Sequence, residues 1–130
     1  MNDFSYQEYL KHTPEHLTAE DADVLYRQMQ EDFDFSDEDL TPLWEKMIQR
    51  ATQYAAIRAS WWQMSREERM EEDDHRTMVH NSVISSLNII ADIERGLGRE
   101  AAWRDKLGDD RKVLGDFACY IALFWGLNAR

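Results

Sequence analysis

Cysteine, proline and glycine are scarce in this chain of 130 residues, which contains one, two and five of them respectively. The single cysteine, Cys119, excludes an internal disulfide, and its apolar neighbours predict a buried, unreactive thiol suited to a reducing cytoplasmic compartment. Scarce helix breakers, together with many Ala, Leu, Met, Glu, Arg and Gln residues, favour helices. No segment alternates apolar and polar residues over the length of a strand. The sequence therefore predicts an all-α protein.

A targeting segment and a long apolar run are also missing. The N-terminal MNDFSYQEYL has no basic region followed by an apolar one, so a signal peptide is not expected. The longest apolar run, residues 113–127, is interrupted by Asp116 and is too short to cross a bilayer. We therefore expect no membrane association.

Basic residues are outnumbered by acidic ones, 15 to 26, and the excess lies in the first third of the chain. Residues 1–45 contain 13 acidic and two basic side chains, whereas residues 46–130 contain 13 of each. Because the phosphates of nucleic acids are met by Lys and Arg, direct nucleic-acid binding is not expected. We interpret the acidic third as a solvated surface, with a contact to a basic protein partner as the alternative.

Capping signals and apolar periodicity divide the chain into five or six helices of one domain, residues 1–130. Helix starts are expected at Ser5, Thr18, Thr41 and Ser65 and near Asp109. A short helix is expected over residues 101–107. The break near residue 64 depends on a capping box alone, so one continuous helix from residue 42 onward is the alternative. Residues 1–40 have weaker apolar stripes, which predicts a loosely packed N-terminal part.

Two helices dominate the expected compact bundle. Residues 75–94 form an amphipathic helix with an apolar face, whose members are Val79, Val83, Leu87 and Ile90. A second line on this helix is polar throughout and consists of Thr77, Asn81, Ser85, Asn88 and Asp92. Residues 113–125 are apolar on nearly all sides, which is typical of a buried helix. The sequence therefore predicts a buried C-terminal helix with residues 75–94 packed against it.

The string from His80 to Val83, HNSV, resembles the phosphoacceptor helix of histidine kinases. That resemblance implies an exposed imidazole at His80 that accepts a phosphoryl group. The residue after that histidine is usually acidic, whereas here it is Asn81, and no nucleotide-binding kinase domain follows. The alternative is a structural histidine at the edge of the core.

The spacing of Glu72 and His75, E-x-x-H, matches half of the helix signature of carboxylate di-iron sites. That chemistry requires a second E-x-x-H segment, and the sequence has none. We therefore interpret the pair as part of a solvated charged segment and predict neither a metal nor another cofactor.

A polar cluster is the remaining candidate site. Its members would be His80, Asn81, Asn88 and Asp92 on one helix and Arg111 and Asp116 on the next. They could line a pocket, and the alternative is a stripe that faces water.

Asp116 is the one charge between residues 113 and 127, so we expect its carboxylate to be buried and paired. Lys112, Arg76 and Arg111 are the candidate partners. A structural ion pair is expected here rather than a catalytic group.

Trp61 and Trp62 are adjacent, and neighbours on a helix point about 100° apart, so they cannot both face one core. One of them is expected at the surface or in a contact between two copies of the chain, because aromatic side chains are enriched at interfaces.

The strings HNSVISSLNIIADI and LGDDRKVLGDFACYIALFWGLNAR together resemble a small family of bacterial helical proteins without assigned activity. The resemblance implies an all-helical fold and no particular chemistry. The sequence contains no nucleophile–base pair or phosphate loop that points to an enzyme. The leading hypothesis is therefore a non-enzymatic interaction or regulatory protein. The alternatives are a phosphotransfer module that uses His80 and a small ligand-binding or metal-binding bundle.

Overall fold

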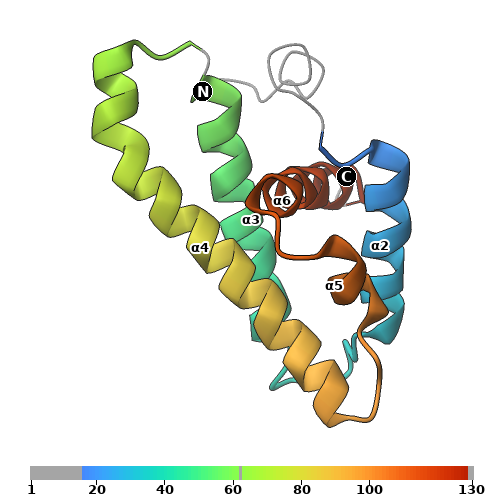
Figure 1. Ribbon diagram of the computed structural model, residues 1–130. Coiled ribbons are helices and arrows are strands. Elements are labelled where there is room, and N and C mark those ends of the chain that lie inside the picture. The colour runs from blue at the N-terminus through green and yellow to red at the C-terminus, as the bar shows by residue number, and fades with distance from the viewer. Residues whose placement is uncertain (1–15, 62, 129–130) are drawn as a thin grey trace.

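The computed structural model describes residues 16–61 and 63–128, which form five α-helices and no strand (Figure 1). The helices are α2 (Ala19–Asp32), α3 (Thr41–Trp61), α4 (Arg66–Gly96), α5 (Ala102–Leu107) and α6 (Arg111–Asn128). The predicted all-α bundle is confirmed, at the lower of the two expected helix counts. The helix expected to start at Ser5 lies outside the described residues.

The break between α3 and α4 shows how local chemistry sets the boundaries of the helices. The Ser65 hydroxyl accepts a hydrogen bond from the Glu68 backbone N–H at 3.1 Å. The Glu68 carboxylate accepts one in return from the Ser65 backbone N–H at 3.0 Å. This capping box satisfies two backbone donors that a helix start leaves unpaired. The alternative of a continuous helix is therefore wrong.

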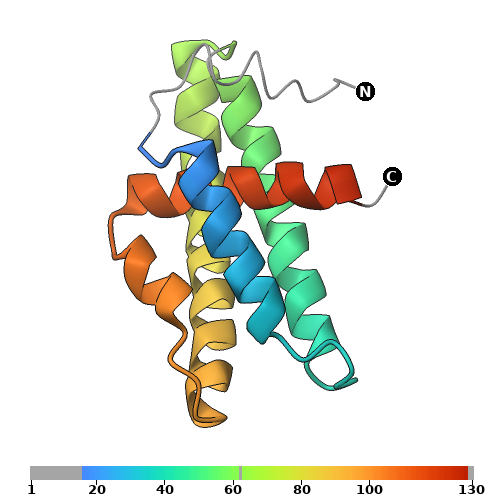
Figure 2. The same cartoon turned by 90° about the vertical axis from the view of Figure 1, so that its right-hand side faces the viewer.

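Helix α6 lies between α2 and the pair formed by α3 and α4. Figure 2 shows α6 running across α3 and α4, with α2 on its outer side. Residues 114–121 are all buried, so the expectation of a buried C-terminal helix holds for this stretch. Phe124 and Trp125 lie outside the residues whose side chains are described. None of the helices described is long and apolar enough to cross a membrane.

The packing partner expected for α6 needs a correction. The sequence predicted that residues 75–94, now part of α4, pack against it. In the structure α3 is the main neighbour of both α4 and α6, and the direct contact between α4 and α6 is smaller and includes Arg111, at the start of α6, beside His80. Because α3 lies alongside α4 and α6 crosses the pair, the apolar face of α4 is covered mainly by α3.

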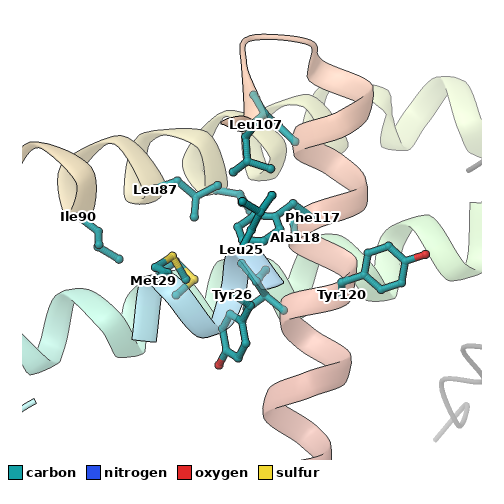
Figure 3. Close-up of a cluster of buried hydrophobic side chains, with 14 of the residues drawn as sticks. Leu25, Tyr26, Met29, Leu87, Ile90, Leu107, Phe117, Ala118 and Tyr120 are labelled. Carbon is teal, nitrogen blue, oxygen red and sulfur yellow. The ribbon is translucent and has the colours of Figure 1, made fainter. Parts of the chain in front are cut away.

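The core joins all five helices. Figure 3 shows Leu25 and Met29 of α2 among Leu87 of α4 and Phe117 of α6. Four residues of α2 are buried in this core, namely Ala22, Leu25, Tyr26 and Met29. The expected loose packing of residues 1–40 stays a prediction. The buried residues of α2 do not support it for that helix.

Helix α6 approaches α3 closely at Gly115. A Cβ atom at this position would lie 3.0 Å from the Tyr54 hydroxyl and 3.1 Å from Nη1 of Arg58. The missing side chain therefore lets the first turns of α6 lie directly against the second half of α3. This contact places Arg111 and Lys112, at the start of α6, beside polar residues of α3 and α4.

Candidate functional site: a cationic cavity between three helices

An open cavity of about 460 Å³ lies where the start of α6 meets α3 and α4. Its lining is mostly basic and aromatic, and we call it the cationic cavity. The lining residues are Tyr54 and Arg58 of α3, Arg76, Thr77, His80 and Asn81 of α4, and Arg111 and Lys112 of α6. The volume falls within the range of about 300–1,000 Å³ that is usual for small-molecule sites.

Arg58 is held by a carboxylate behind the cavity. Its Nη2 atom lies 2.6 Å from Oδ1 of Asp116, and the two side chains are 11% and 5% exposed. The prediction that Asp116 is buried and paired is confirmed. The three predicted partners were wrong, because Gly115 brings α6 against α3 and so presents Arg58 to the carboxylate.

The other oxygen of Asp116 fixes the segment before α2. Oδ2 accepts hydrogen bonds from the backbone N–H groups of His16 at 2.6 Å and Leu17 at 3.0 Å. One carboxylate oxygen therefore forms an ion pair with a guanidinium, and the other accepts two backbone hydrogen bonds. Asp116 therefore joins α6, α3 and the segment before α2.

Arg111 brings together two residues of the predicted polar cluster. Its Nη2 atom lies 3.1 Å from Nδ1 of His80 and donates to Oδ1 of Asn81 at 2.7 Å. Both contacts use the same nitrogen, and the other two guanidinium nitrogens form no hydrogen bond with the described residues. The sequence placed these three residues in one cluster, and the structure does bring them together.

His80 is a neutral, buried wall of the cavity. Its ring stacks on Tyr54 with a centroid distance of 4.7 Å and an angle of 15° between the planes. Burial, followed by the positive charge of Arg111, lowers the pKa of His80 to about 4. Because Nδ1 faces a guanidinium donor, the proton of the neutral ring belongs on Nε2. Nε2 is buried and has no hydrogen-bond partner among the residues described, so the geometry does not favour a phosphoacceptor role.

Three cations of the cavity lack a neutralising partner within the described part of the chain. Arg76 lies over the ring of Trp61, with 4.8 Å from its guanidinium carbon to the ring centroid, and its buried Nε has no acceptor there. Among the described residues, Arg76, Arg111 and Lys112 form no ion pair. Arg58 is already neutralised by Asp116. The cavity is therefore lined by three cations for which the described residues supply no ion pair.

Two members of the predicted cluster lie elsewhere. Asn88 accepts a hydrogen bond from Nε of Arg104 at 2.8 Å, and Asp92 lies 3.3 Å from Arg95 on the same helix. Neither lines the cationic cavity. The Asp92 side chain is 74% exposed, so it faces water, as the alternative prediction had it.

Trp61 is half-buried beneath Arg76, which gives it a contact within the chain. Trp62 lies outside the described residues. The expected interface between copies of the chain therefore stays a prediction.

The half-signature of a di-iron site is exposed. Nδ1 of His75 lies 3.2 Å from Oε2 of Glu72 on the solvent side of α4. Within residues 16–61 and 63–128, no three His, Cys, Asp or Glu side chains are grouped closely enough to hold a metal ion.

Comparison of the chain with known protein families, characterised proteins and solved structures found no match. The resemblance to a small bacterial family is therefore not carried further.

Sequence reasoning missed the contribution of α3 to the site. Tyr54 and Arg58 are not among the predicted site residues, and Arg76 and Lys112 are predicted only as candidate partners of Asp116. A signal was present, because Arg58 is a charge within the stripe Tyr54, Ala55, Arg58, Ala59. A charge on an apolar face requires a partner inside the fold.

Proposed function

We propose that this protein is a non-catalytic binding protein for a small molecule that carries a phosphate or similar anionic group. The observation that carries the proposal is the convergence in one open cavity of three cations, Arg76, Arg111 and Lys112, that form no ion pair within residues 16–61 and 63–128. The chain as a whole has a net charge of −11, with 26 acidic residues against 15 basic ones, so the gathering of cations is not a consequence of its composition.

The arrangement has an energetic cost that an anion removes. Like charges gathered around one cavity repel one another and destabilise the compact state. An anion bound among them would relieve this repulsion and accept charge-assisted hydrogen bonds. The planar guanidinium groups of Arg76 and Arg111 match the oxygens of phosphate and carboxylate, and Lys112 adds a mobile third donor. Three cations favour a dianionic phosphate over a single carboxylate.

The walls support binding rather than chemistry. His80 is neutral, and burial raises the pKa of the Tyr54 phenol, so both rings stay uncharged at neutral pH. Stacked aromatic rings form a rigid boundary and lower the local dielectric, which strengthens the interaction of the cations with an anion. The ion pair of Arg58 with Asp116 holds one side of the cavity in place.

Titration calorimetry with inorganic phosphate, at constant ionic strength set by chloride, tests the proposal. The variants Arg111→Gln and Lys112→Gln should each weaken phosphate binding about tenfold or more, in keeping with the 1.5–3 kcal/mol of a hydrogen bond to a charged group. Arg66→Gln and Lys106→Gln are matched controls, because these cations are exposed and lie outside the cavity.

The melting temperature of the parent chain should rise with phosphate, since a ligand of the native state stabilises it. Absence of phosphate binding, or equal losses in the cavity and control variants, would refute the proposed function.

A further inference from the structure

A second cavity adjoins the cationic one. It has a volume of about 510 Å³ and lies between α3 and α4. Thr77 and Asn81 line both cavities, so the two meet along this part of α4. A molecule whose anionic group lies in the cationic cavity can therefore extend past Asn81 into the second one. We call the second cavity the serine groove.

The α4 side of the serine groove is rich in groups that both donate and accept hydrogen bonds. Ser82, Ser85 and Ser86 follow Thr77 and Asn81 along the helix. A hydroxyl supplies one donor and two acceptor positions, and an amide supplies both kinds as well. The carbonyl of Asn81 is engaged by Arg111, which turns the NH₂ group of the amide away from that contact.

The α3 side and the rim complete the chemistry of the groove. Lys46, Arg50 and Asp74 are its charged residues, and the Nε atom of Arg50 is buried without a hydrogen-bond partner among the described residues. Met78 and Ile89 lie along the groove and are 60% and 46% exposed, unusually high for large apolar side chains. Mixed donors and acceptors beside a small apolar patch match a compact hydroxylated molecule, which has polar edges and an apolar face.

We infer that the ligand is a phosphate monoester of a small hydroxylated molecule, with its phosphate in the cationic cavity and its hydroxyl-bearing part in the serine groove. The inference rests on the proposed function, because the same cations hold the phosphate. The shared lining by Thr77 and Asn81 allows one molecule to occupy both cavities. The serine groove would then supply selectivity, and the cationic cavity would supply most of the charge recognition.

Calorimetry with four probes under one buffer condition tests the inference. The probes are inorganic phosphate, ribose 5-phosphate, adenosine monophosphate and ribose. Ribose 5-phosphate should bind at least about tenfold more tightly than inorganic phosphate, and ribose alone should bind far more weakly than its ester. Adenosine monophosphate tests whether the ligand can carry a base on its sugar. Binding equal to that of ribose 5-phosphate, or tighter than it, supports the inference.

Variants separate the two cavities. The double variant Ser82→Ala, Ser85→Ala should weaken ribose 5-phosphate binding about fivefold or more and leave inorganic phosphate binding unchanged. Ser36→Ala is the matched control, because this exposed serine lies outside both cavities. Arg111→Gln should weaken the binding of all three phosphate-bearing probes.

The two proposals fail in different ways. If inorganic phosphate binds but ribose 5-phosphate binds no more tightly, the serine groove has no role and only this inference falls. If the serine variant weakens inorganic phosphate as much as the ester, the division between the cavities is wrong. If no phosphate probe binds, the proposed function falls together with the inference.

Discussion

Replacing Asp116 with Ala should destabilise the fold strongly. The change removes the carboxylate that lies 2.6 Å from Arg58, whose side chain is only 11% exposed. It also removes the acceptor of the backbone N–H groups of His16 and Leu17. Both losses leave donors in a partly or fully buried setting, where water can replace the carboxylate only in part.

The expected magnitude follows from these contacts. Removing one partner of a buried ion pair typically costs 3–5 kcal/mol, since the other charge stays buried and uncompensated. Arg58 lines the open cationic cavity and can be reached partly by water, which favours the lower end of that range. We therefore expect a loss of about 3 kcal/mol, a large fraction of the 5–15 kcal/mol that usually stabilises a domain.

Urea unfolding followed by circular dichroism measures this loss. With a denaturant slope of about 1–3 kcal/mol per molar urea, the midpoint should fall by roughly 1–3 M. Asp116→Asn should cost less than Asp116→Ala, because the amide oxygen can still accept from the backbone. Asp92→Ala is the matched control, since that carboxylate is 74% exposed and its ion pair with Arg95 is solvated. The control should change the free energy of unfolding by no more than about 0.5 kcal/mol.

A double-mutant cycle with Arg58→Met isolates the ion pair from the backbone contacts. The two single variants should together cost clearly more than the double variant, because each single change leaves an unpaired buried charge. A loss for Asp116→Ala within about 0.5 kcal/mol would mean that the carboxylate faces water. Strict additivity in the cycle would mean that Arg58 is not its partner.

Three further predictions concern single positions. His80 has a pKa of about 4 in the native state against an ordinary 6.5, so the native state binds fewer protons than the unfolded state between these pH values. The shift corresponds to roughly 3 kcal/mol of stability, which is fully present above pH 6.5 and is lost as the pH falls toward 4. The difference in unfolding free energy between the parent and His80→Gln should follow this course, and a difference that does not vary with pH would contradict it. Glu94 is buried against the Trp103 indole, and burial raises the pKa of its carboxyl group. The ionised carboxylate therefore lowers the stability of the fold as the pH rises above the ordinary pKa of 4.5. Glu94→Gln should raise the melting temperature at pH 7, and a lower melting temperature would count against this account. Gly115→Ala should lower the free energy of unfolding in urea by about 1 kcal/mol despite the better helix propensity of Ala, because the new Cβ would lie 3.0 Å from the buried Tyr54 hydroxyl. Gly96→Ala is the control, because a Cβ at that position meets nothing within 4 Å, and equal effects of the two variants would refute the argument.

The sequence predicted those features that depend on residues close together in the chain. Thr18 caps α2 through its hydroxyl, which accepts from the Asp21 backbone N–H at 3.1 Å, and Ser65 caps α4 in the same way. Such caps involve groups three residues apart, so the type of residue and its spacing are enough to find them. The burial of Asp116 was predictable for a similar reason, since its neighbours along the helix are apolar.

The partner of Asp116 was not predictable from local spacing. Arg58 is far from it in the chain and reaches it only because α6 crosses α3 at Gly115. A helical stripe also gives no information on where along its length another helix crosses. Asn81 and Asp92 share a stripe but lie about 16 Å apart along the axis, at 1.5 Å per residue. Helix α6 reaches the first and not the second, which is why the predicted cluster divided.

The sign of the net charge did not indicate the sign of the site. A balance of −11 describes the whole chain, whereas an anion inside a cavity interacts most strongly with the few charges around it. At physiological ionic strength the field of exposed acids falls off over about 8 Å, so the more distant carboxylates contribute little at the cavity. Cations that line a partly buried cavity are screened much less. An acidic chain can therefore contain a local site that attracts anions, and the three-dimensional distribution of Arg and Lys decides which ligand it favours.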